Sequence, residues 1–154
     1  MPDLEVRAAT VDDVEGIEPL VADALTRLAT LRGGSALLEM AGMPEGAGPE
    51  EVASALCGGA LLDTTTLVAT LSGSVVGVAV AVRTDAGLDL IGVHTSRSLR
   101  RRRIGTTLLD ATRAIAGELG VRFEALALPG DQTVKSLLEA SGFKARLLRM
   151  AADR

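Results

Sequence analysis

The stretch SLRRRRIGTTLLDATRAIAGELG, residues 98–120, places four consecutive arginines directly before a segment with helical periodicity. From Ile104 to Leu119 the apolar side chains recur three and four residues apart, and the charged ones lie off that face. This spacing predicts an amphipathic helix that Gly120 ends as a C-cap. Because the N-terminus of a helix favours negative charge, the arginines mark this helix start as a site for an anionic ligand.

The basic run is a local feature of an acidic chain. The 154 residues carry a net charge of −4, although residues 97–103 alone hold five arginines, and aromatic residues make up only 1%. An acidic chain with so few aromatic residues for base stacking argues against nucleic-acid binding. We find no uncharged apolar run of about 18 residues and no apolar leader, so we expect one soluble cytoplasmic domain over residues 1–154, without membrane association.

The order of the elements can be read from periodicity and turn residues. Residues 4–10 alternate as a strand, and a helix follows that Pro19 should kink or split. Two β-branched runs flank Ser72-Gly73, a hairpin turn, and a third strand follows a turn over residues 84–87. The remaining elements are a short helix opened by Pro49, the helix after the arginines, a strand over 121–128, a helix over 132–140 capped by Asp131, and a last strand over 143–151.

This order, β-α-α-β-β-β-α-β-α-β, predicts a single α/β (α+β) domain with a mixed, mostly antiparallel sheet and helices on both faces. Its third sequential strand leads into the arginine segment. At that junction the unpaired first-turn amides can bind an anion, and the arginines can add charge-assisted hydrogen bonds to phosphate oxygens. Gly105 allows a close backbone approach because it has no Cβ. We therefore expect a diphosphate to bind there.

Metal and thiol chemistry receive little support from the composition. The chain has one cysteine, Cys57, and one histidine, His94. This argues against a zinc site, and we predict no metal. Cys57 lies in the sequence ALCGG with no histidine nearby, so we interpret it as a small buried apolar residue rather than a nucleophile.

The arginine segment resembles the signature of the GCN5-related N-acetyltransferase (GNAT) family. That signature has Arg or Gln, two variable residues, Gly, one variable residue, then Gly or Ala. Arg100 and Gly105 match it, whereas Arg103 stands in place of the first glycine. Later positions are similar to the family pattern of Asn, Ala, Tyr and Gly-Phe, here occupied by Asp131, Val134, Leu138 and Gly142-Phe143.

The resemblance covers nearly the whole chain and implies the acyl-CoA N-acyltransferase fold, with acetyl-CoA as co-substrate. It implies that strands 88–93 and 121–128 splay apart to admit the cofactor, and that main-chain groups of the first strand pair with the pantetheine arm. The amides and guanidinium groups after that strand would hold the pyrophosphate. The residues so assigned to the cofactor are Ile91, Gly92, Val93, Arg100, Arg101, Arg102, Arg103, Ile104, Gly105, Thr106, Asp131 and Leu138.

Catalysis of amine acetylation needs a proton acceptor and donors for the oxyanion, and a backbone N–H near Val93 could supply one. Asp89, on the strand that leads to the cofactor site, is our first candidate for the base, and His94 and Glu124 are alternatives. Many relatives protonate the leaving thiolate with a tyrosine, but this chain has none, and Leu138 occupies the matching position. Water could protonate the thiolate, or proximity alone could sustain turnover.

The resemblance therefore implies an acetyl-CoA-dependent N-acetyltransferase that transfers an acetyl group directly to a primary amine of a small molecule, peptide or protein. The missing tyrosine leaves an alternative, a non-catalytic acyl-CoA-binding or regulatory module. The acidic remainder of the chain slightly favours a cationic amine as acceptor. Homodimerisation is a further expectation, since members of the family frequently dimerise.

Overall fold

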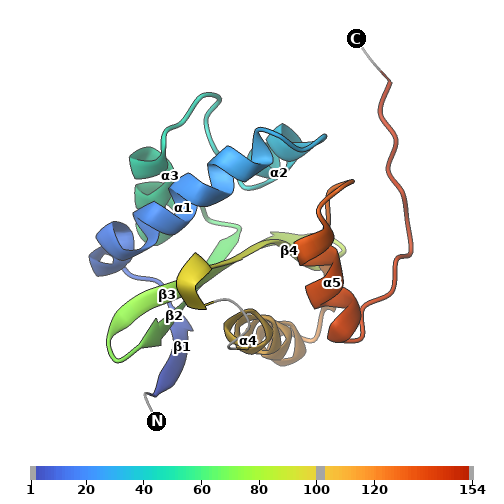
Figure 1. The fold of residues 1–154 in the computed structure, drawn as a ribbon. Coiled ribbons are helices and arrows are strands. Elements are labelled where there is room, and N and C mark those ends of the chain that lie inside the picture. Colours follow the sequence, from blue (N-terminus) through green and yellow to red (C-terminus); the bar gives the residue numbers. More distant parts are fainter. Residues whose placement is uncertain (1–2, 100–102, 153–154) are drawn as a thin grey trace.

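Five strands form one mixed sheet in the computed structural model, which describes residues 3–99 and 103–152 (Figure 1). Neighbouring strands in the sheet are also neighbours in sequence, and all pairs are antiparallel except β4 and β5, which are parallel. The strands are β1 (Leu4–Ala8), β2 (Thr64–Leu71), β3 (Ser74–Thr84), β4 (Gly87–Thr95) and β5 (Arg122–Ala125).

Helices cover both faces of this sheet, as the sequence predicts. Figure 1 shows α1, α2 and α3 on one side, α4 on the opposite side, and α5 at the right of the view. The helices are η1 (Val11–Asp13), α1 (Val14–Leu28), α2 (Gly34–Met40), α3 (Pro49–Cys57), η2 (Arg97–Leu99), α4 (Ile104–Leu119) and α5 (Gln132–Ala140). The predicted fold class and the mostly antiparallel sheet are therefore confirmed.

Local turn and cap residues set the element boundaries. Ser72 and Gly73 both have positive φ values, of 51° and 84°, which suits the tight connection between β2 and β3. Gly120 ends α4 in the left-handed conformation, with φ of 68°. Asp131 caps α5, because its carboxylate accepts a hydrogen bond from the Val134 amide at 3.3 Å. These predicted boundaries are confirmed.

An ion pair between the half-exposed Arg7 and the buried Asp13 joins β1 to the start of the first helical segment. Asp13 is 5% exposed and accepts two hydrogen bonds from the Arg7 guanidinium, at 2.7 and 2.8 Å, and one from the Thr10 amide at 2.8 Å. These contacts, chiefly the bond from Arg7, hold the pKa of Asp13 at about 2. α1 then runs without interruption through Pro19, so of the two outcomes predicted there, a split helix is excluded.

The core is aliphatic and lies in two layers, one on each side of the sheet. Ile17, Val52 and Val68 pack between the sheet and helices α1 and α3, and Leu108 and Leu109 of α4 pack on the other face. Gly77 of β3 permits this second contact, because a Cβ there would lie only 2.8 Å from Cγ2 of Ile104. The first turn of α4 is thereby held close against the sheet.

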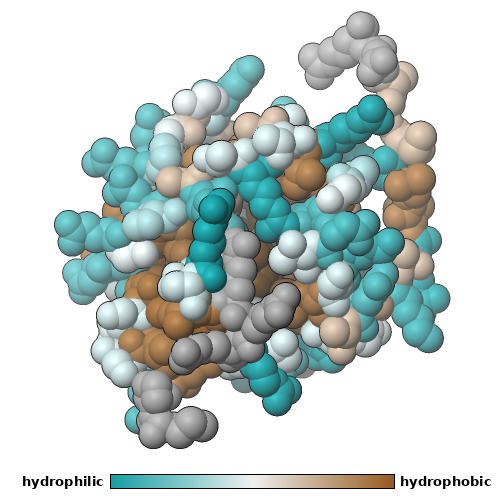
Figure 2. Space-filling view, viewed as in Figure 1, coloured by the Kyte–Doolittle hydropathy of each residue, from teal (hydrophilic) through white to brown (hydrophobic). Residues whose placement is uncertain are grey.

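The predicted last strand over residues 143–151 is wrong. In this segment the chain adopts no strand, and Figure 1 shows it standing away from the body. The strand over 121–128 is also shorter than predicted, since β5 ends at Ala125. Leu147 and Leu148 are adjacent, so a strand would point them to opposite faces, and both remain exposed, as does Met150. Apolar residues accordingly colour this tail at the right of Figure 2.

Candidate functional site

A β-bulge reshapes β4 where the sequence predicts the cofactor. Val80 of β3 lies opposite Gly92, whereas its neighbour Ala81 lies opposite Leu90, so Ile91 is an extra residue in β4. A bulge bends a strand and redirects the side chains that follow it. In β4 it separates the regular half of the strand from the half that reaches α4.

Strands β4 and β5 part at the same point. Their parallel pairing ends at Leu90 and Ala125, apart from a hydrogen bond from the Leu126 amide to the Leu90 carbonyl at 2.9 Å. Within the described ranges, no strand pairs with residues 91–93 on the β5 side. The splay implied by the family resemblance is therefore present, and it leaves main-chain donors and acceptors of β4 open for a ligand that binds as an added strand.

A pocket opens where the end of β4, the start of α4 and the start of α5 meet, and we call it the polar pocket. It has a volume of about 480 Å³. The lining residues include Val93 and Thr95 of β4, Ile104, Gly105 and Thr106 of α4, and Thr133 of α5. Among the residues that the structure describes, the first helical hydrogen bond of α4 runs from the Thr107 amide to the Arg103 carbonyl at 3.0 Å, and the three lining amides of α4 lie before it in the chain.

Arg103 lies at the N-cap of α4 and also lines the polar pocket. Its φ of 62° is left-handed, a conformation in which a glycine would be unstrained. This backbone conformation therefore explains why the family signature has a glycine at the position that Arg103 occupies here. Arg100, Arg101 and Arg102 lie outside the described residues.

The next glycine in the chain, Gly105, lies close to a side chain of α5. A Cβ on Gly105 would lie 3.2 Å from Cδ2 of Leu137, a residue of α5. The predicted role was close approach of the backbone to the anion. The structure adds that Gly105 lets α5 pack against the first turn of α4, which forms one wall of the polar pocket.

A second pocket lies next to the first, beneath α1, and we call it the apolar pocket. It is lined mainly by aliphatic side chains from α1, α3, β3 and β4, such as Val21, Leu25, Leu56, Val80 and Ile91. The two pockets share Arg27, Val93, His94 and Val134, which we call the junction. Figure 2 shows apolar surface at the bottom of a hollow near the centre of this face.

One side of the junction is bridged by an ion pair between α1 and α5. Arg27 contacts the carboxylate of Asp131, whose side chain is only 8% exposed. The sequence predicts Asp131 as a helix cap near the cofactor, and the structure places it in the lining of the apolar pocket. Arg27 compensates the charge that distinguishes Asp131 from the asparagine of the family pattern.

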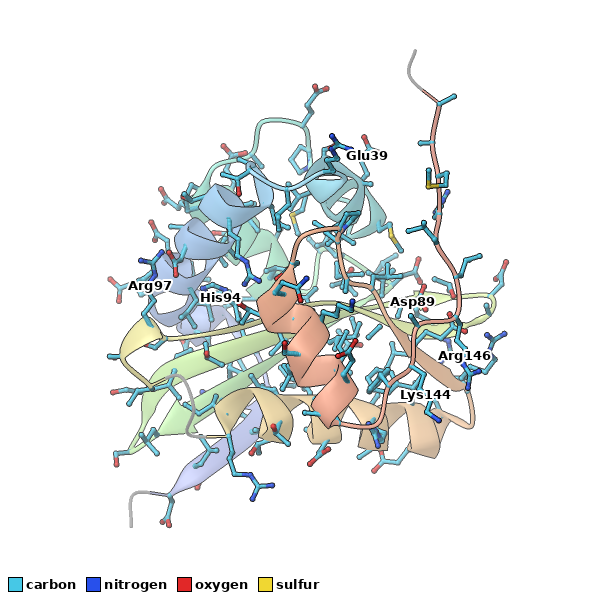
Figure 3. All side chains as sticks on the ribbon, turned by 45° about the vertical axis from the view of Figure 1, so that its right-hand side comes forward. Glu39, Asp89, His94, Arg97, Lys144 and Arg146 are labelled. Atoms are coloured by element: carbon cyan, nitrogen blue, oxygen red, sulfur yellow. The ribbon has the colours of Figure 1, made fainter. Side chains whose placement is uncertain are left out.

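The other side of the junction holds a histidine with a carboxylate partner. His94 is 7% exposed, and its Nε2 lies 3.1 Å from Oδ2 of Asp23 on α1. Asp23 also accepts hydrogen bonds from Arg97 at 2.8 and 3.1 Å. These two partners, Arg97 first, lower the pKa of Asp23. Figure 3 shows His94 and Arg97 together beside α1.

Two of the predicted site residues, Asp89 and Leu138, line neither the polar pocket nor the apolar pocket. Asp89 is at the opposite end of β4 (Figure 3), across from Glu124 of β5, and lines neither pocket. Burial, followed by the charge of Glu124, raises the pKa of Asp89. Glu124 itself pairs with Arg122 at the surface. Leu138 is buried in the core against α4, so the predicted contact between Leu138 and the cofactor is not supported by its position.

Cys57 lies in the core, and burial raises its pKa to about 11, which agrees with its interpretation as an unreactive apolar residue. Across residues 3–99 and 103–152 no three His, Cys, Asp or Glu side chains gather into a metal site. In the same part of the chain no helix is both long and apolar enough to cross a bilayer.

Sequence reasoning did not single out Asp23 and Arg27. Both lie on α1, four residues apart and therefore on one face, at the margin of its apolar stripe. An oppositely charged pair at that margin is the signal that could have identified them. Their partners, His94 and Asp131, are 71 and 104 positions away in the chain, a relationship that only the fold reveals.

Comparisons with known proteins agree with this fold. A sequence model of the acetyltransferase (GNAT) family matches residues 39–143. No curated protein matches the chain significantly in sequence. Among solved structures, aminoglycoside N-acetyltransferase AAC(6')-Iy in complex with CoA is 16% identical, with a TM-score of 0.69 over 100% of this chain and 96% of that chain.

Two further structures are similar at the level of the fold. The PaiA N-acetyltransferase of Thermoplasma acidophilum in complex with coenzyme A is 15% identical, with a TM-score of 0.72 over 94% of this chain and 91% of that chain. A ribosomal-protein-alanine N-acetyltransferase of Brucella melitensis biovar Abortus 2308 is also 15% identical, with a TM-score of 0.72 over 99% of this chain and 100% of that chain.

Proposed function

The chain belongs to the acetyltransferase (GNAT) family, whose members use acetyl-CoA, and we propose that it transfers the acetyl group directly to a primary amine. The observation that carries this proposal is the edge of β4 over residues 91–93, which pairs with no strand on the β5 side in the described chain, beside the first-turn amides of α4. An extended pantetheine arm can pair with that edge while the diphosphate lies at the helix start. The thioester then falls at the junction.

The cofactor contacts follow from that placement. Main-chain groups of Ile91, Gly92 and Val93 pair with the pantetheine amides. The amides of Ile104, Gly105 and Thr106 bind the pyrophosphate, and the Arg103 guanidinium adds charge from the rim of the polar pocket. A backbone amide near Val93 donates to the thioester oxygen and stabilises the oxyanion as the amine attacks.

His94 is the proton acceptor that the geometry supports best. It lines both pockets, and so lies where thioester and amine would meet. When Nε2 donates its proton to Asp23, Nδ1 keeps a lone pair that can take a proton from the amine. Arg97 keeps Asp23 ionised, so the carboxylate can hold the ring in this tautomer. Asp89 is the competing candidate, although its position is less favourable.

The same imidazole removes the need for a tyrosine. The amine nitrogen forms a bond to the thioester carbon, the carbon–sulfur bond breaks, and the sulfur leaves as a thiolate. The proton that His94 has taken from the amine passes to that sulfur. The products are the N-acetylated amine and CoA, and His94 returns to its neutral form without any other acid.

The acceptor is proposed only as a class. Structural neighbours are named as acetyltransferases of aminoglycosides, of a ribosomal-protein alanine and of diaminobutyrate, so small molecules and proteins both occur among them. Binding of acetyl-CoA by calorimetry, followed by thiol release with a panel of amines, tests the proposal. We expect saturable binding and thiol release above background. Binding without turnover by any amine would favour the regulatory module, and no binding at millimolar acetyl-CoA would contradict the proposal.

We also propose that two copies associate through the tail, residues 144–152. Three apolar side chains of the tail, Leu147, Leu148 and Met150, are between 72% and 87% exposed. In the sheet, β5 is an edge strand. A tail from a second copy that adds to this edge would pair the open edge, with Leu148 and Met150 on one face of the added strand and Leu147 on the other.

A further inference from the structure

We propose that the apolar pocket receives the aliphatic chain of an acyl-CoA longer than acetyl-CoA, with an acyl group of roughly four to six carbons. This inference rests on the proposed function, because it uses the cofactor placement given there. It names the acyl donor, which the family assignment leaves as acetyl-CoA by default.

The lining residues that the two pockets share are the first support. A cofactor that lies in the polar pocket, with its diphosphate at α4, brings its thioester to the shared residues Val93 and His94. The same residues line the apolar pocket, so that pocket borders the place proposed for the thioester. An acyl group extended by several methylenes would therefore enter it without any change in how CoA is held.

Gly92 adds open space on the β4 side of the apolar pocket. This residue lines the pocket, directly after the bulge, and apart from its chain neighbours no atom of the described residues lies within 4 Å of the position that a Cβ would occupy there. A side chain at this position would point into open space. Glycine in a strand often marks a close approach of a ligand, and here the structure shows the space that the ligand would use.

The chemistry of the walls selects an aliphatic occupant. The charged groups in the lining are Arg27, Asp131 and His94, and all three already have partners: the first two pair with each other, and His94 contacts Asp23. Beyond them the walls are aliphatic, for example Val21, Leu28 and Leu37. A cationic amine would lose its hydration there without gaining a counter-ion. A methylene chain would gain about fourfold in affinity per group buried.

The size of the pocket limits the chain length. Its volume is about 120 Å³. An apolar protein cavity of about 150 Å³ holds a benzene molecule, so this pocket suits a group slightly smaller than that ring. Acyl chains of roughly four to six carbons should fit, whereas much longer ones should not.

The test is equilibrium binding of CoA, acetyl-CoA, butyryl-CoA, hexanoyl-CoA and dodecanoyl-CoA by calorimetry, with no amine present. We expect affinity to rise from acetyl to hexanoyl by about fourfold per methylene, then to fall for dodecanoyl. If CoA binds but affinity stays flat from acetyl to hexanoyl, the inference is overturned and the pocket belongs to the apolar part of the acceptor. If CoA itself does not bind, the proposed function fails together with this inference.

A matched pair of variants separates the pocket from non-specific hydrophobic binding. Ala24 lines the apolar pocket and not the polar one, whereas Ala22, two residues earlier on α1, lines neither. We expect Ala24→Leu to reduce the advantage of hexanoyl-CoA over acetyl-CoA by about tenfold or more, and Ala22→Leu to preserve it. Val80→Leu, on the β3 wall, serves if Ala24→Leu does not fold. An unchanged advantage in a folded pocket variant would overturn the inference.

Discussion

Arg27 and Asp131 join α1 to α5 across the junction of the two pockets. The Asp131 carboxylate makes two kinds of contact. It pairs with Arg27, and it accepts the hydrogen bond from the Val134 amide that caps α5. The ion pair thus fixes the distance between the helix above the apolar pocket and the helix beside the polar pocket. Changes to the pair should therefore affect both stability and cofactor binding.

We predict that Asp131→Asn lowers the free energy of unfolding by about 1 kcal/mol while it strengthens CoA binding a few-fold. Asparagine caps a helix as well as aspartate does, but it gives up the charge that holds Arg27. Arg27 can then turn toward the phosphates, since it also lines the polar pocket. Urea unfolding and calorimetry measure the two effects. Asp131→Ala, which removes the cap as well, should be less stable than Asp131→Asn; weaker CoA binding in Asp131→Asn would contradict the prediction.

At the N-cap of α4, Arg103→Gly should change stability and binding in opposite directions. Glycine relieves the left-handed backbone at φ of 62°, and after its own entropic cost we expect a net gain of about 0.5 kcal/mol. Loss of the guanidinium should weaken CoA binding a few-fold. Arg103→Ala is the control, because it removes the charge but keeps the strain. Equal melting temperatures for the two variants would show that the backbone there is not strained.

For the chemical step, we predict that His94→Gln lowers kcat by about 100-fold or more, because a general base contributes that much. Asp23→Asn should lower kcat less, about tenfold, and shift the pH profile, since it acts through the ring. Steady-state kinetics with the best amine of the panel measures both. The comparison variant is Asp89→Asn. A larger loss in Asp89→Asn than in His94→Gln would return the role of base to Asp89.

The Arg7–Asp13 pair should set the acid limit of stability. The pKa of Asp13 is about 2 in the folded protein, against 3.8 for the free side chain, so its ionised form stabilises the fold above pH 4. This contribution, about 2 kcal/mol, is lost as the pH falls from 4 through 2. Urea unfolding at pH 7, 4 and 3 should show a steeper loss for the natural protein than for Asp13→Asn. Parallel curves for the two proteins would contradict this assignment.

Removal of the tail tests the proposed dimer. If Leu147, Leu148 and Met150 hold two copies together, a chain ending at residue 143 should be a monomer when the full chain is a dimer. Light scattering coupled to gel filtration gives the mass of each. A milder variant, Leu147→Ser with Leu148→Ser, keeps the length of the tail and should weaken association. A dimer that survives both changes would place the interface elsewhere.

Most element boundaries could be predicted because they depend on neighbouring residues. Ser72-Gly73, Gly120 and Asp131 each specify a turn or a cap through their own backbone or side chain, and the structure has those features in place. The last strand could not be predicted from its own residues, since a strand forms only where another strand pairs with it. FKARLLRMA has the composition of a strand, yet no edge in the described chain receives it.

The site was predictable where it depends on backbone, and less so where it depends on side chains. The start of α4 and the edge residues of β4 follow from the arginine run and the strand before it. Gly92 was a weak indication of the bulge at Ile91, since a glycine inside a strand often accompanies a bulge. The contact between His94 and Asp23 had none, because it depends on how α1 crosses the sheet.

The sheet order has a consequence for the path of folding. Strands β1 to β4 are sequence neighbours, except for the long connection after β1, and hairpins of this kind close quickly. The parallel partner β5 can dock only after α4 has crossed the sheet, which makes its pairing the slower event. The crevice between β4 and β5 should therefore be completed late, and a ligand that occupies it should act chiefly by slowing the unfolding rate rather than by speeding the folding rate.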